Sequence, residues 1–144
     1  MKLTRRFVLA SALAGIASLS VGTRLSRAAD SDPSAAAQSQ IERGLAYLKS
    51  QQQPDGGWQQ ANEPPAITAI AVKAFVQDPK FKADDPFLTK AFDKLLSYQK
   101  EDGSISDDNL ATYNTAIALS ALGESKQEKY KHAMEKALGY LRSI

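Results

Sequence analysis

The chain has 144 residues, of which 43% are apolar and 24% are charged, with no cysteine and one histidine. This composition is typical of one globular domain, and it excludes disulfides, thiolate metal sites and multi-histidine metal sites. Five of the 18 basic residues lie in the first 28, so the rest of the chain has 13 basic against 16 acidic residues, a net charge of −3. A mildly acidic chain has no electrostatic footprint for nucleic acid.

Residues 1–29 have the pattern of a cleaved export signal. A basic start leads into a modestly apolar run over residues 7–21, and Ser26 and Ala28 put small residues at the positions that a signal peptidase reads. The run is too short for a comfortable membrane span, although an uncleaved N-terminal anchor is the alternative. The pattern predicts a mature chain without a stable membrane span, with residues 30–38 as a flexible lead-in.

A pair of arginines, Arg5 and Arg6, gives this signal its type. The pair resembles a twin-arginine export signal. The apolar run behind it is diluted with alanine, glycine and serine, and further arginines follow the run. Both features resemble signals that avoid the general secretion route, so the sequence predicts a periplasmic or extracellular location.

A repeat of 47 residues follows the signal. A shift of 47 positions places Gln52 on Gln99 and aligns residues 68–71 with residues 115–118, both of which read Thr-Ala-Ile-Ala. A partial third copy opens at residue 136. The units span residues 39–78, 85–123 and 125–144, and each full unit is predicted to be a pair of helices.

In the first unit, Ser39 and Glu42 form a predicted capping box that opens the first helix. A turn over residues 54–57 ends that helix. The second helix is expected to begin near Pro65 and to end before Pro79. It is rich in small and apolar residues, which is typical of an inner helix packed on several sides, whereas the more charged first helix is expected to lie outside.

The second unit repeats this pattern. Asp85 is expected to cap a helix that runs from residue 86 to about residue 100. The inner helix is predicted from about Asp108 to residue 122, with Gly123 as its terminator. A second capping box over residues 125–128 opens the third unit.

A motif in residues 43–58 resembles the QW repeat of squalene and oxidosqualene cyclases. Its defining positions are all filled, by Arg43, Gly44, Tyr47, Leu48, Gln52, Gly56 and Trp58. The chain is therefore similar to the prenyltransferase/squalene oxidase repeat group, which includes squalene-hopene cyclase. The resemblance implies an all-α fold of helical hairpins that form part of an α/α toroid.

The resemblance also implies a structural role for this QW motif. A glutamine amide has two donors and two acceptor sites, so Gln52 can tie the backbone at one helix end to the next helix. The indole of Trp58 shields those bonds and adds apolar area. We interpret Arg43, Gly44 and Tyr47, together with Gly56, as parts of the same clamp, with a ligand platform at Trp58 as the alternative.

The catalytic residues of the family are not found in these hairpins. Class II cyclases carry a DxDD motif before the Thr-Ala of an inner helix, and neither Thr-Ala here is preceded by an acid. Prenyltransferases hold zinc with Asp, Cys and His, whereas this chain has no cysteine and His132 lies in a charged run. We therefore expect no metal and no cofactor.

Asp107 and Asp108 are the weak catalytic candidates. They are interpreted first as helix-capping charges, and alternatively as a paired-carboxylate site at the mouth of the toroid. By resemblance, Tyr113 and Asn114 border the central cavity. The residues favour a non-catalytic module that binds a lipid, a peptide or a protein.

Two other functions stay open. The chain is expected to be a truncated piece of a longer toroid, since its third unit stops within a motif. In that case a terpene cyclase or prenyltransferase could carry its catalytic hairpins beyond residue 144. A carbohydrate-active (α/α) protein is the third hypothesis. A short chain would instead self-associate through the open edges of its repeats.

Overall fold

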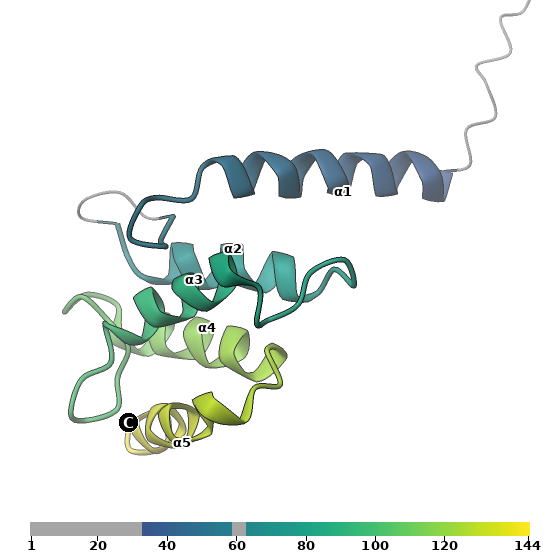
Figure 1. Ribbon diagram of the computed structural model, residues 1–144. Helices are drawn as coiled ribbons and strands as arrows, with labels where there is room; N and C mark the ends of the chain where they lie inside the picture. The colour runs from purple at the N-terminus through teal and green to yellow at the C-terminus, as the bar shows by residue number, and fades with distance from the viewer. Residues whose placement is uncertain (1–32, 59–62) are drawn as a thin grey trace, which may run out of the picture. The chain divides into compact units, whose positions relative to one another are not determined.

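The computed structural model describes residues 33–58 and 63–144 of the chain (Figure 1). The residues that carry the predicted export signal, including Arg5, Arg6 and Ala28, lie outside the described residues. The described part forms one compact unit, residues 33–144, and it is all-helical, which confirms the predicted class. Its elements in chain order are α1 (Pro33–Ser50), α2 (Ala66–Val76), α3 (Pro86–Leu96), α4 (Ala111–Glu124), a 3-10 turn (Glu128–Tyr130) and α5 (Lys131–Arg142).

Helix α1 corrects two predictions about the start of the first unit. It begins at Pro33, so residues 33–38 are helical rather than a flexible lead-in. Ser39 lies inside the helix and therefore caps nothing, because a capping side chain needs the free N–H groups of a first turn. Glu42 contacts Gln38, whose amide Nε2 lies 3.4 Å from the carboxylate, and it pairs with Lys80.

Helices α2 and α4 lie side by side as an inner pair. Lys73 donates to Ser120 at 2.8 Å, and Gln77 lies 3.4 Å from Glu124. Both pairs join residues 47 positions apart and follow the same order, so the two helices run parallel. Small side chains allow this close approach: Ala69 of α2 is fully buried, as are the two α4 residues Ala118 and Ala121.

Helix α3 begins at Pro86, where the sequence predicts it, but its end differs. Asp85 holds the N-cap position without a side-chain cap, because its carboxylate accepts from the backbone N–H of Lys82 at 3.1 Å. The helix ends at Leu96 rather than near Lys100. An isolated antiparallel bridge between Gln99 and Ile105 takes over there.

Helix α4 begins later in the chain than the sequence predicts, because two residues before it have positive φ angles. The backbone of Asp108 has φ 81° and that of Leu110 has φ 47°, in a region that helical residues do not adopt. The helix therefore begins at Ala111 instead of Asp108, and neither Asp107 nor Asp108 caps it.

The end of α4 corrects two further predictions. Gly123 lies inside the helix, which runs to Glu124. The predicted capping box over residues 125–128 does not form: the Ser125 hydroxyl accepts from the backbone N–H of Gln127 at 3.3 Å and donates to the carbonyl of Leu122 at 2.5 Å. That hydroxyl closes α4 instead of opening the next helix, and a 3-10 turn leads into α5.

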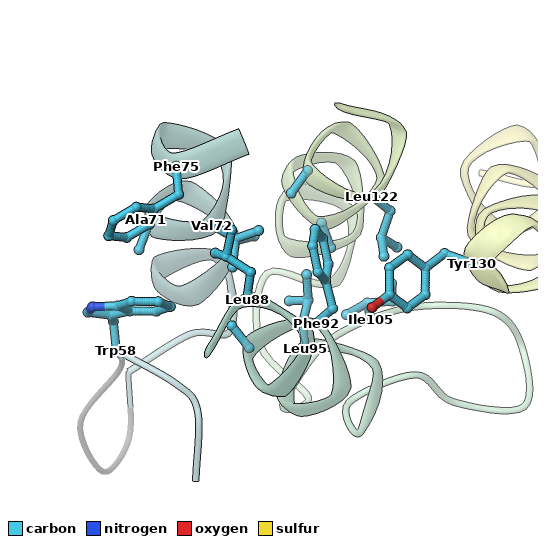
Figure 2. Close-up of a cluster of buried hydrophobic side chains, with 14 of the residues drawn as sticks. Trp58, Ala71, Val72, Phe75, Leu88, Phe92, Leu95, Ile105, Leu122 and Tyr130 are labelled. Carbon is cyan, nitrogen blue, oxygen red and sulfur yellow. The ribbon is translucent and has the colours of Figure 1, made fainter. Parts of the chain in front are cut away.

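The core lies where the inner pair meets the outer helices (Figure 2). Helix α3 packs against α2, and α5 packs against α4. On one side, Phe75 of α2 makes edge-to-face contacts with Phe81 and Phe87 at ring-centroid distances of 5.0 and 5.1 Å. On the other side, Phe92 lies 4.8 Å from the ring of Tyr130. Helix α1 buries little by comparison, with Leu45 as its one core residue.

Within residues 33–58 and 63–144, none of the helices combines the length and the apolar character needed to cross a bilayer.

Candidate functional site

Gln52 lies at the centre of the QW motif and links two helices. Its amide Nε2 donates to the carbonyl of Gly56 at 2.9 Å and to that of Phe87 at 2.8 Å. The first bond closes the turn after α1, and the second reaches the first turn of α3. The side chain is partly buried, where a hydrogen bond is worth more than at the surface.

Trp58 joins the end of α1 to α2. Its indole Nε1 donates to the carbonyl of Leu48 at 2.7 Å, and its backbone N–H donates to the hydroxyl of Thr68 at 2.9 Å. The indole lies beside Ala71 and Phe75 (Figure 2), with a ring-centroid distance of 5.8 Å to Phe75. Only 8% of the residue is exposed.

Position 56 requires a glycine because of its backbone conformation and because a neighbouring backbone lies close to it. Its φ of 96° is rare for any residue with a side chain. A Cβ at this position would lie 2.5 Å from the carbonyl oxygen of Lys90 in α3. The turn of the first unit thus touches the backbone of the second unit directly.

Asp55 stabilises the conformation of the same turn. Its carboxylate accepts from the backbone N–H of Gly57 at 3.0 Å and pairs with the Lys94 ammonium at 2.9 Å. The Gly57 N–H, followed by Lys94, lowers the pKa of Asp55 below its usual value. Lys94 stands where the first copy has Tyr47, so the second copy replaces an aromatic ring with a charge that binds the preceding turn.

Three of these bonds, two from Gln52 and one to Thr68, have counterparts about 47 residues later. Gln99 donates to the carbonyl of Ala133 at 2.9 Å, and its Nε2 lies 3.4 Å from the carbonyl of Gly103. The backbone N–H of Ile105 donates to the hydroxyl of Thr115 at 2.9 Å. Gly103 has φ 90°, and a Cβ there would lie 2.3 Å from the carbonyl of Lys136. The threonine hydroxyls were missed in the sequence, although the shared Thr-Ala-Ile-Ala was the signal for them.

Three residues of the predicted clamp lie away from these bonds. Arg43 and Gly44 are exposed on α1, and no atom of the described residues would lie within 4 Å of a Cβ added to Gly44. Tyr47 is also exposed to solvent, by 64%.

Asp107 and Asp108 do not act as a pair. Asp108 is exposed and pairs with Lys100, which raises the pKa of Lys100. Oδ1 of Asp107 is buried and has no hydrogen-bond partner among the described residues. The two carboxylates therefore sit in different surroundings.

The two cavity-lining candidates also separate. Tyr113 is 50% exposed on α4. Asn114 is fully buried and donates through Nδ2 to the carbonyl of Asn109 at 2.8 Å, while its Oδ1 has no partner among the described residues. Asn114 thus lies in the interior of the described part of the chain, whereas Tyr113 lies on its surface.

A groove between α1 and α2, here called the α1–α2 groove, is a large hollow of the described residues. Its main part has a volume of about 500 Å³ and is lined by α1 and the end of α2. A smaller apolar hollow of about 210 Å³ adjoins it, because Leu48 and Ala74 line both. Helix α1 contributes Ile41, Leu45 and Leu48 to the lining. Trp58, Ile67, Ile70 and Ala71 line the smaller hollow.

Exposed apolar side chains mark this groove. Ile41 is 50% exposed, Ile67 is 39% exposed and Ile70 is 48% exposed. The sequence did not indicate the groove, because the same residues were expected to pack inside the helix pair. The one available signal was that α2 is apolar around most of its circumference.

Metal binding has no support in the described ranges, where no cluster of three or more acidic, cysteine or histidine side chains could hold an ion. His132 lies exposed on α5.

Comparisons of the chain with protein-family models, curated proteins and solved structures find no match.

Proposed function

We propose that the chain is an exported protein of the prenyltransferase/squalene oxidase repeat group whose hairpins are units of an α/α toroid. The filled QW motif in residues 43–58 supports the family. The duplicated bonds of Gln52 and Gln99, and of Thr68 and Thr115, support the repeat. Parallel inner helices covered by outer helices are the arrangement that stacked hairpins need to bury their apolar faces.

The proposed function is binding of an apolar ligand or partner rather than catalysis. The observation that carries this proposal is the α1–α2 groove, where Ile67 and Ile70 stay partly exposed beside a buried tryptophan. Contiguous exposed apolar surface of this kind marks interaction sites in soluble proteins. The lipid, peptide or protein occupant predicted from the sequence would bind there.

An apolar fluorescent dye, anilinonaphthalene sulfonate, tests the site in the full chain. Trp58 is the only tryptophan and it lines the groove, so energy transfer from its indole reports dye bound there. We expect saturable transfer that Ile70→Arg removes. Tyr113→Arg is the matched control, because Tyr113 is equally exposed but lies on α4. Dye binding that survives Ile70→Arg would contradict a binding role for the groove.

A cyclase or prenyltransferase has one observation in its favour. Among the described residues, Oδ1 of Asp107 is buried without a hydrogen-bond partner just before an inner helix, and a carboxyl group can act as a general acid or base. This function would require further hairpins beyond residue 144. The intact mass of the protein from its native host decides: a mass far above that of residues 29–144 would favour the enzyme.

A further inference from the structure

We propose that the α1–α2 groove is the receptor for a single α-helix of a partner protein. The helix runs parallel to α2 and presents small apolar side chains to it. This inference rests on the proposed binding function and names the class of partner.

The chain itself contains the template for such a complex. Helix α2 contacts both α3 and α4. The α3 residues that stand 47 positions after the α1 residues of the groove are all fully buried: Leu88, Ala91, Phe92 and Leu95. Leu88, the counterpart of Ile41, is fully buried, whereas Ile41 is 50% exposed. Asn114, the counterpart of Ile67, is fully buried, whereas Ile67 is 39% exposed. One groove is thus filled by a helix, and its equivalent is open.

The filled groove also defines the chemistry of the occupant. Helix α2 presents fully buried Ala69 and Val72 within the core, and its Lys73 donates to Ser120 of α4. The open α1–α2 groove has Lys73 of α2 where the filled groove has Ser120 of α4, 47 positions later in the chain. An occupant therefore needs an oxygen acceptor at that point, because a second lysine would repel the first. An ammonium has three donors, so Lys73 can serve Ser120 and the occupant together.

A lone helix fits better than a second copy of this chain. Helix α3 lies on α2 and α5 lies on α4, so each inner helix is covered by the outer helix that follows it in the chain. For the occupant of the α1–α2 groove, α1 already takes that covering position. A second copy that offered α4 would bring its own α5 to the place of α1, and the two helices would collide.

A synthetic peptide of residues 109–125 is a suitable probe. Its Ala116, Leu119 and Ser120 stand at the repeat positions of Ala69, Val72 and Lys73, and it contains no tryptophan. It is titrated into the full chain while the fluorescence of Trp58 is recorded. The control peptide carries Ala116→Asp and Leu119→Asp, which place charges on the contact face.

We expect a saturable one-to-one change that the control peptide does not produce. Ile70→Arg in the chain should weaken binding at least about tenfold, the effect of roughly 1.4 kcal/mol, while Tyr113→Arg should leave binding unchanged. Absence of saturable binding, or equal binding to the Ile70→Arg chain, would overturn the inference. If the dye bound but the peptide did not, the inference of a helical partner would be overturned, while the proposed binding of an apolar ligand would stand.

Two other occupants would also overturn the inference. Concentration-dependent dimers in sedimentation, lost in Ile70→Arg, would show that a second copy fills the groove. Cross-links from the groove to residues 7–21 of the same chain would show that its own N-terminal segment does.

Discussion

Trp58 holds the first unit together through three contacts at once, two of them made by its indole. It donates to the carbonyl of Leu48, its backbone N–H donates to Thr68, and its ring packs against Phe75. We predict that Trp58→Ala lowers the free energy of unfolding by roughly 3–5 kcal/mol, the usual cost of deleting a buried tryptophan. Chemical denaturation followed by circular dichroism measures this change in the free energy of unfolding.

Tyr47→Ala is the matched control for this prediction. Tyr47 belongs to the same motif but is 64% exposed, so its removal should change stability by no more than about 0.5 kcal/mol. A cost near zero for Trp58→Ala would refute the clamp.

The two glycines of the motif should respond in opposite directions to alanine. Gly56→Ala places a Cβ 2.5 Å from the Lys90 carbonyl at a φ of 96°, so we predict a loss of roughly 1–3 kcal/mol from backbone strain and a further loss from the clash. Gly44→Ala meets open space inside a helix and should stabilise by roughly 0.5–1 kcal/mol. Thermal and denaturant unfolding of both variants measures the two effects.

This contrast shows why the motif could be found in the sequence while the role of each residue in it could not. Pattern and spacing identify Gly44 and Gly56 equally. What separates them is the approach of Lys90, a residue of the next unit, and that approach exists only after the units stack. If Gly56→Ala proved neutral, the close contact between the units would be wrong.

At the scale of the helices, the packing of α2 against α4 depends on small side chains. Ala69 is fully buried, whereas its counterpart Ala116 is exposed on the free side of α4. We predict that Ala69→Leu destabilises by roughly 1–3 kcal/mol through overpacking, and that Ala116→Leu stays within about 0.5 kcal/mol of the original chain. Equal costs in denaturant unfolding would contradict the parallel packing of α2 and α4.

The helices themselves were largely predictable, because apolar spacing and prolines such as Pro86 are local signals. Their ends were not. Ser39 and Ser125 match a capping pattern, yet one lies inside α1 and the other donates to the end of α4. A serine hydroxyl can close one helix as well as open the next, and tertiary contacts decide which it does.

At the scale of the molecule, the α1–α2 groove could not be predicted from the sequence. Ile67 and its counterpart Asn114 occupy the same place on their helices, but only Asn114 has a neighbouring helix over it. Exposure therefore depends on position in the stack and not on residue type. For the same reason Asn114 is buried, while the open apolar surface lies one unit earlier at Ile67.

The location of the protein depends on residues 1–29, which we propose to be a twin-arginine export signal. Recognition of such a signal requires the arginine pair itself and not only its charge. We predict that Arg5-Arg6→Lys-Lys stops export, so that the unprocessed chain accumulates in the cytoplasm of the native host. Fractionation with immunoblotting, and the intact mass of the protein in each fraction, measure both the location and the cleavage.

A second variant separates the arginine pair from the general charge of the segment. Arg24→Lys keeps the charge as well but lies behind the apolar run, so it should be exported and cleaved near Ala28 like the original chain. Normal export of the Lys-Lys variant would instead point to the general secretion route. That route delivers chains unfolded, so the clamp and the groove would then have to form after export rather than before it.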